Sequence, residues 1–138
     1  MQALQDDYLA VEGYLVERLN SIEGIRKVYR SCDLAEMKET AQTTPALHVI
    51  YNGDQVTNTA QGGALAHVKQ TWLVVLTVDL RKHRDTGALL ARVIKTMSGL
   101  HCELGTLVRV NAPRPGFSQG FGYYPLAFEI TFRTQPKR

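Results

Sequence analysis

"HVKQTWLVVLTVDL", residues 67–80, is the stretch that decides the fold of this 138-residue chain. Its side chains alternate with the two-residue period of a β-strand. One face carries Val68, Gln70, Trp72, Val74, Leu76, Val78 and Leu80. On the other face Leu73 and Val75 stand where polar residues would alternate. The pattern therefore predicts a long strand whose middle is buried on both sides.

Further strands are predicted on both sides of this one. Residues 125–134, "PLAFEITFRT", have the same two-residue period. The side chains of that segment expected to face the core are Leu126, Phe128, Ile130 and Phe132. Shorter strands are predicted at residues 25–30, 45–54 and 106–110. Residues 53–66 hold too few large apolar side chains to pack, so we expect an extended, mobile hairpin or loop there.

Two segments have the three- and four-residue spacing of an amphipathic helix. The apolar stripe of the first consists of Leu4, Tyr8, Val11, Leu15, Leu19 and Ile22. Gly24 is predicted to end it, because glycine tolerates the left-handed conformation common at helix ends. The second helix is expected to begin at an N-cap, Asp85, and to end at Gly99. Its predicted stripe consists of Leu90, Ile94 and Met97.

The order of these elements predicts an α+β fold. Strands come in runs between only two helices, in the order α-β-β-β-α-β-β. This order favours a mainly antiparallel sheet with two helices packed against one face. No repeat and no linker divides the sequence, so we expect one domain over residues 1–138.

Composition indicates a soluble protein that is not exported. The two cysteines, Cys32 and Cys102, are far apart and form no CxxC pair, which is typical of reduced thiols. The N-terminus carries acids where a signal peptide has basic residues. The longest apolar run, "WLVVLTV", is far shorter than the roughly 20 residues of a membrane-spanning helix.

Charge is unevenly distributed along the chain, although the net charge is only +3. Residues 1–69 hold six Lys or Arg against nine Asp or Glu, whereas residues 70–138 hold ten against four. If the folded protein has an acidic and a basic face, copies of it could dock through them. The alternative is that the charges interleave in space.

No catalytic, metal or cofactor motif is present, so we expect neither an enzyme nor a cofactor. His101 and Cys102 are adjacent on a predicted strand and would point to opposite faces, which places them poorly as a base and a nucleophile. The other histidines and Cys32 are too scattered for zinc. The glycine-rich segment 113–125 precedes a strand, whereas a phosphate-binding loop precedes a helix.

Nucleic-acid binding is an alternative function. The basic cluster "RKHR", residues 81–84, could contact phosphates, and the aromatic residues of "PRPGFSQGFGYYP", residues 113–125, could stack bases. The final strand, however, alternates like a strand with one buried face and lacks the exposed aromatic side chains of an RNA-recognition sheet.

Four segments in order carry a resemblance to a known family. They are "PALHVIYNGD", "KQTWLVVLTV", the helix "GALLARVIKTMSGL", and the aromatic segment leading into "YYPLAFEITF". Together with the preceding amphipathic helix, they resemble the tail terminator proteins of long-tailed bacteriophages and related prophages. The resemblance covers nearly the whole chain, and another neck or tail-completion protein of the same virion region is the nearest alternative.

This resemblance implies a structural protein of the virion that is assembled in the host cytoplasm. Such proteins form a ring, typically a homohexamer, on the head-proximal end of the tail tube. The ring stops polymerisation of the tail tube protein and offers a surface to the neck or head-completion protein. DNA later passes through its lumen without specific recognition. Head-to-tail contacts between subunits close such a ring.

On this interpretation two surface segments are candidates for contact with neighbouring subunits or with the tube, and residues 53–66 are a third. The candidate residues are Arg81, Lys82, Arg84, Phe117, Phe121 and Tyr123. Interface hot spots are enriched in aromatic side chains, and glycines let the backbone lie close to a partner. In the alternative, the aromatic side chains fold back over their own subunit. The contact hypothesis predicts that replacing Phe117 and Phe121 by alanine blocks assembly and leaves monomer stability nearly unchanged.

Overall fold

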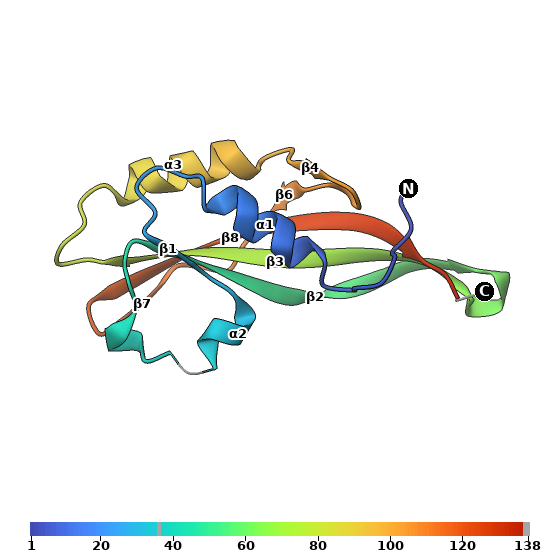
Figure 1. Cartoon of the computed structure of the whole chain (residues 1–138), viewed down its shortest axis with the longest axis horizontal. Helices are drawn as coiled ribbons and strands as arrows, with labels where there is room; N and C mark the ends of the chain where they lie inside the picture. Colours follow the sequence, from blue (N-terminus) through green and yellow to red (C-terminus); the bar gives the residue numbers. More distant parts are fainter. Residues whose placement is uncertain (36, 137–138) are drawn as a thin grey trace.

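The computed structural model describes residues 1–35 and 37–136 (Figure 1). Its helices are α1 Val11–Leu19, α2 Ser31–Leu34 and α3 Thr86–Met97, with 3-10 turns η1 Glu39–Ala41 and η2 Gln61–Gly63. Its strands are β1 Lys27–Tyr29, β2 Ala46–Ala60, β3 Leu65–Asp79, β4 His101–Cys102, β5 Gly105–Thr106, β6 Val108–Val110, β7 Gly116–Ser118 and β8 Phe121–Thr134.

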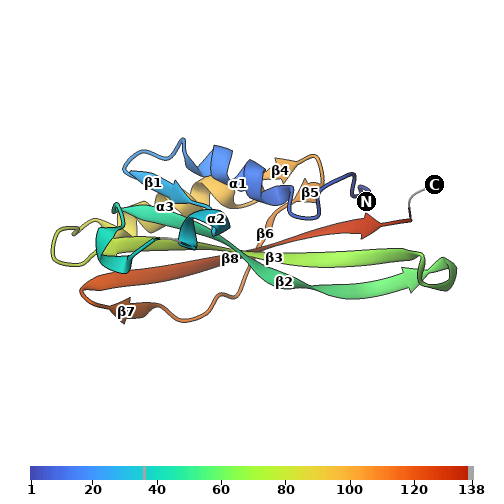
Figure 2. The same cartoon turned by 60° about the horizontal axis from the view of Figure 1, so that its bottom comes forward.

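One sheet organises the molecule, with the strand order β1-β2-β3-β8-β6 and β7 also paired to β8. Among the described strands, only β1 and β2 pair in parallel, and the other strand pairings are antiparallel. A single parallel bridge joins Ala3 to Arg133. Helices α1 and α3 lie on the same face of this sheet (Figures 1 and 2). The predicted α+β class and mainly antiparallel sheet are therefore confirmed. Strand β7 and the pairing of β4 with β5 in a separate small sheet were not predicted.

The core lies between the sheet and the helices α1 and α3. Strand β3 contributes the face that its alternation predicted, and Trp72 pairs in register with Phe128 of β8. The largest fully buried side chains include Trp72, Phe128, Phe132, Leu15, Leu19, Leu47, Leu76 and Leu89. Because directly paired residues of an antiparallel sheet share a face, the two long strands bring their aromatic and aliphatic side chains together in one layer.

Both main helices differ from the sequence prediction. Helix α1 begins at Val11, because residues 2–4 bond to the backbone of Arg133 and continue the sheet. In α3 the buried residues are Leu89, Val93 and Met97, so Met97 agrees with the prediction and the other two lie one position before the predicted Leu90 and Ile94. Both stripes are apolar, and the buried one includes Leu89, which packs against Gly24. A Cβ on Gly24 would lie 2.8 Å from Leu89 Cδ2. The predicted N-cap, Asp85, makes no side-chain capping bond.

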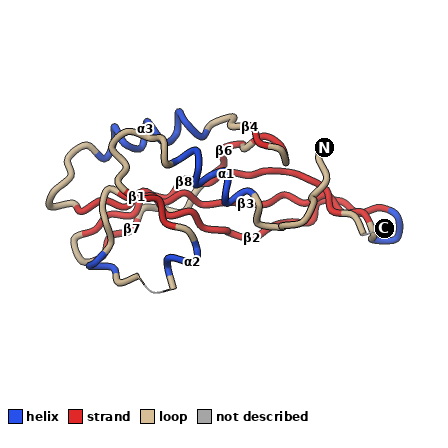
Figure 3. The backbone as a smooth tube through the Cα atoms, viewed as in Figure 1, coloured by secondary structure: helices blue, strands red, loops and turns tan. Residues whose placement is uncertain are grey.

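Residues 53–66 form the outer part of a regular hairpin. Strands β2 and β3 pair from Ala46 to Ala60 with two bulges, and η2 closes the end. Figures 1 and 3 show this hairpin extending past the helices, with the C-terminus of β8 beside it. We call residues 55–66 the arm. Of the two predicted alternatives, an extended hairpin or a loop, the structure has the hairpin, and its strands are continuous with the central sheet.

Candidate functional site

The basic and aromatic segments predicted from the sequence lie together at the end of the sheet opposite the arm (Figures 1 and 3). One segment is the turn between β3 and α3, and the other is the hairpin β7–β8. The backbone N–H of Leu80 donates to the carbonyl oxygen of Gly120 at 2.9 Å, which joins the two. This end of the molecule is therefore one continuous surface built from two segments far apart in the sequence.

The aromatic segment is a tight hairpin, where the sequence predicted a loop. Strand β7 pairs with the start of β8, and Ser118 pairs with Phe121 across a two-residue turn. Gln119 and Gly120 both have positive φ, 51° and 83°. Two such residues make a turn whose twist matches that of the flanking strands. Strand β8 accordingly begins at Phe121, four residues earlier than predicted.

Arg81 is held by its own subunit. Its side chain bonds Asp79 through Nε at 3.1 Å and Nη2 at 3.3 Å, and its backbone N–H donates to Asp79 Oδ1 at 3.0 Å. The Arg81 hydrogen bond lowers the pKa of Asp79, and Asp79 raises the pKa of Arg81. The guanidinium also lies over Gly120, where a Cβ would be 3.1 Å from Nε. Arg81 thus stabilises the junction between turn and hairpin.

Lys82 and Arg84 are the exposed cations of the same turn. Among the described residues, no carboxylate lies within ion-pair distance of either side chain. His83 between them turns inward, and its Nε2 lies 3.2 Å from Thr44 Oγ1. These two side chains therefore give the turn its available positive charge.

The three predicted aromatic residues differ in exposure. Phe117 is 65% exposed and meets Tyr124 edge to face, with ring centroids 6.0 Å apart. Phe121 is only 5% exposed, so the expectation that it is free to contact a partner is wrong. Tyr123 is half-buried, and its hydroxyl donates to Glu39 and accepts from Gln42 Nε2 at 3.1 Å.

A chain of hydrogen bonds fastens the β7–β8 hairpin to the segment that precedes β2. Ser118 and Tyr123 both donate to the carboxylate of Glu39, at 3.1 Å for Ser118 Oγ. Gln42 bonds Tyr123 on one side and His48 Nε2 on the other, at 3.2 Å. Burial raises the pKa of Tyr123, helped by Glu39, and burial lowers the pKa of His48. The hairpin is therefore fastened by side-chain hydrogen bonds to the segment that precedes β2 in its own subunit.

Two further residues of this surface, the exposed Leu80 and the partly buried Tyr124, were not among the predicted contact residues. Leu80 is 37% exposed because it follows the last paired residue of β3, although its position in the alternation predicted burial. Tyr124 packs against it across Gly122, where a Cβ would lie 2.9 Å from Tyr124 Cε2 and 3.2 Å from Leu80 Cδ2. In the sequence, Gly122 directly before the two tyrosines was the available indication that a large side chain packs closely over this position. We call Leu80, Lys82, Arg84, Phe117 and Tyr124 the hairpin-end patch.

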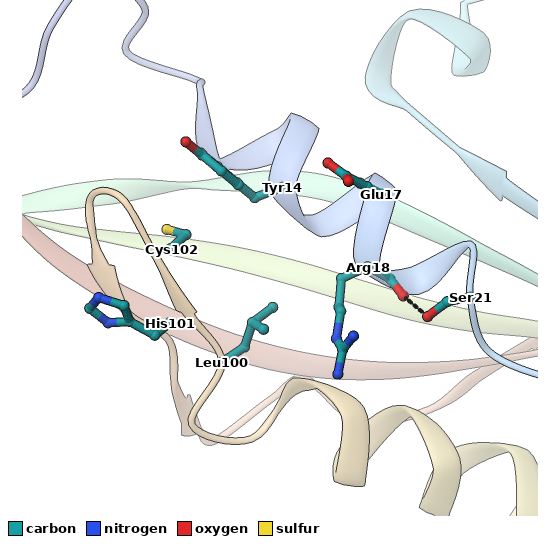
Figure 4. Close-up of a pocket in the computed structure, with 7 residues that line it drawn as sticks. All are labelled: Tyr14, Glu17, Arg18, Ser21, Leu100, His101 and Cys102. Atoms are coloured by element: carbon teal, nitrogen blue, oxygen red, sulfur yellow. Dashed lines mark hydrogen bonds between the residues drawn. The ribbon is translucent and has the colours of Figure 1, made fainter.

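A separate open pocket of about 440 Å³ contains His101 and Cys102, between α1 and strand β4 (Figure 4). His101 is exposed and its Nδ1 lies 3.0 Å from Thr106 Oγ1, whereas Cys102 is buried. The two side chains therefore lie on opposite faces of β4, as the alternation predicted. Opposite them, Ser21 Oγ donates to the carbonyl of Arg18 at 2.7 Å. This arrangement pairs no base with the thiol.

Within the described residues, no three His, Cys, Asp or Glu side chains gather as a metal site would require. No described helix is long and apolar enough to cross a membrane.

Comparison with known proteins gives one family and one fold. Residues 4–138 match the model of a family described as phage tail terminator protein. No match is found among curated proteins. A chain in a solved structure described as the virion of a native gene transfer agent particle has 14% sequence identity and a TM-score of 0.50. That similarity covers 91% of this chain and 88% of the other, and it concerns the fold.

Proposed function

The chain belongs to the phage tail terminator family, and from this premise we propose that it caps the head-proximal end of the tail tube as a hexameric ring. The family match over residues 4–138 is the observation that carries the proposal. A protein of this family is a structural protein of the phage tail, so the chain works in virion assembly with other tail and head proteins.

In the proposed mechanism, capping depends on complementary surfaces. The ring covers the growing end of the tube, stops addition of the tail tube protein, and presents its outer face to the neck or head-completion protein. Assembly takes place in the host cytoplasm, and DNA passes through the lumen without specific recognition. Head-to-tail contacts join two different surfaces of each subunit, and a rotation that closes gives a ring.

The shape of the subunit supports such contacts. The arm and the hairpin-end patch lie at opposite ends of the long axis (Figure 1). The patch combines the exposed ring of Phe117 with the cations Lys82 and Arg84, a composition favoured at protein interfaces when an acidic partner is available. We propose that this patch contacts a neighbouring subunit or the tube.

The alternative of a nucleic-acid-binding module receives less support. In such a module Arg81 would be less available to phosphates because it pairs with Asp79, and Phe121 would be unavailable for stacking because it is buried. Sequence-independent binding to single strands uses exposed aromatic rings in a basic groove, and Phe117 is the one strongly exposed ring of the segment.

Tube polymerisation tests the proposal. The purified protein is added to polymerising tail tube protein of the same phage or prophage, and tube lengths are measured by electron microscopy. We expect shorter tubes, each with a ring at one end only. Unchanged tube lengths and bare ends would contradict capping.

A charge-reversed variant tests whether the hairpin-end patch contributes to capping. Lys82→Glu with Arg84→Glu should raise the protein concentration needed for capping about tenfold or more, since rim charges control encounter and orientation. Lys95→Glu, an exposed position on α3, serves as the matched control. Equal capping by both variants would remove the patch from the mechanism.

A further inference from the structure

The arm is a long, exposed ribbon with little to stabilise it in solution. Residues 55–66 contain no Asp, Glu, Lys or Arg, and every residue from Gln55 to Ala64 is exposed. Strand β8 reaches only to the pair Ala66–Thr134, so the outer arm has two strands. Isolated two-stranded ribbons are marginally stable, and exposed edges usually carry Lys or Pro to prevent pairing. The arm has one bulge, between Val56 and Asn58, but neither of these residues.

A complementary surface lies on the sheet face away from α1 and α3. Ile50 pairs with Leu73, Leu73 with Ala127, and Ala127 with Val110. These four residues form an apolar row across β2, β3, β8 and β6, and all except Ala127 are partly exposed. A solvated face of an antiparallel sheet normally carries polar side chains. The row therefore has the character of a surface that another molecule covers.

A pocket of about 260 Å³ opens beside the row. It lies between the sheet and the segment around α2, and it shares Ile50 with the row. Leu34, Met37 and Val75 make its lining largely apolar. In Figure 1, α2 lies on this side of the sheet, toward the end away from the arm. The segment thus covers part of this face and leaves the remainder open.

The arm of a subunit cannot cover its own row, because the arm continues the same strands outward from the sheet (Figures 1 and 2). Its six residues from Gln55 to Ala60 extend about 20 Å, and four neighbouring strands span about 14 Å. The arm is therefore long enough to cross the row of a second copy. Of the two large apolar side chains of the arm, Val56 is 59% exposed, whereas Leu65 is partly buried.

We propose that the arm of one subunit packs across the apolar row of the next, with Val56 at the pocket beside Ile50. A second copy is the occupant favoured by the chemistry, because the arm and the row are both free of charge and belong to the same chain. The contact joins two different surfaces, as a head-to-tail ring requires. The inference rests on the proposed ring and names the surfaces that close it.

Disulfide trapping tests this contact without tube protein. Two differently tagged copies, both carrying Cys32→Ser to remove the exposed thiol, receive Val56→Cys and Ile50→Cys respectively. They are mixed under mild oxidation, and the mixed disulfide is measured by mass. The control pairs Val56→Cys with Ala88→Cys, an exposed position on α3. We expect the first pair to form about tenfold faster or more, because docking raises the effective thiol concentration.

Equal rates for the two pairs would overturn the inference, and so would trapping confined to Val56→Cys with itself, which would indicate arm-to-arm pairing. Val56 is exposed and Ile50 partly so, and thermal unfolding of each variant verifies that it folds. Rapid trapping together with failure to shorten tubes would retain the subunit contact and reject the capping function. Capping without selective trapping would retain the capping function and reject the contact between the arm and the row.

Discussion

Phe117 and Phe121 lie four residues apart in one hairpin, yet they have opposite environments. Phe117 projects from β7 into solvent, and Phe121 begins β8 with its side chain buried beside the turn after β3. The two-residue turn at Gln119 and Gly120 produces this difference, because it sets which face of the sheet each residue occupies. At the scale of the residue, aromatic type alone did not separate a surface residue from a core residue.

Single alanine substitutions should separate the two phenylalanines. Phe121→Ala is expected to lower the free energy of unfolding by about 3–4 kcal/mol, because it leaves a cavity in a packed site. Phe117→Ala should lower it by less than about 1 kcal/mol while weakening assembly. Denaturant unfolding of the monomer measures both values. Equal losses would show that Phe117 stabilises the monomer as much as the buried Phe121 does.

Burial of His48 predicts a pH dependence of stability. Its pKa is lowered by burial in the folded state, where it stacks on Tyr29 with ring centroids 5.0 Å apart. The unfolded chain therefore binds the proton more readily, and stability falls as pH drops below the ordinary histidine pKa of about 6.5 toward the folded pKa. Unfolding of the wild type and of His48→Gln at several pH values measures this dependence. If the two curves stay parallel through this window, His48 does not cause it.

At the scale of the element, the N-terminal segment holds the base of the arm. Gln70, fully buried on β3, donates to the carbonyl of Tyr8 at 2.8 Å and accepts from Trp72 Nε1 at 2.8 Å. The Tyr8 hydroxyl bonds Asp54, and its ring packs edge to face on Phe132. Burial and the Asp54 carboxylate raise the pKa of Tyr8. One buried amide therefore connects the first ten residues to the central strand, and the Tyr8 hydroxyl extends this connection to Asp54, just before the arm.

Gln70→Met should release this connection. The substitution retains volume but leaves the Trp72 N–H and the Tyr8 carbonyl without their partner, so we expect a loss of about 2 kcal/mol or more of unfolding free energy. Hydrogen exchange should also become faster in residues 2–10. Gln55→Met on the exposed arm is the matched control. Unchanged exchange in the N-terminal residues would show that other contacts hold the segment.

At the scale of the whole molecule, stability and assembly occupy different parts of the chain. The core lies between the sheet and the helices α1 and α3, whereas the arm lies beyond both helices (Figure 1). The arm contributes few buried side chains. A feature that adds little to stability yet extends far from the core is suited to contact another molecule.

Shortening the arm tests this separation. Val56 pairs with Val68, so replacing residues 57–67 by Asn-Gly should close the hairpin with a two-residue turn. We expect the free energy of unfolding to fall by only about 1–2 kcal/mol, since the deletion also removes the pairs that Ala66 and His67 form with β8, and tube capping to be lost. Calorimetry and the tube-length measurement report the two effects. A shortened protein that still caps would show that the arm is dispensable.

The sequence by itself determined the α+β class, the buried faces of β3 and β8, and the family resemblance that the family match confirmed. These depend on side-chain periodicity, which is local and survives in the linear order of residues. Only the tertiary structure decided which apolar stripe of α3 is buried, that Arg81 is paired with Asp79, and that Phe121 lies inside. It also brought Ile50, Leu73, Ala127 and Val110 into one row. Each of these depends on strand register and on contacts between distant segments, and local spacing does not encode either.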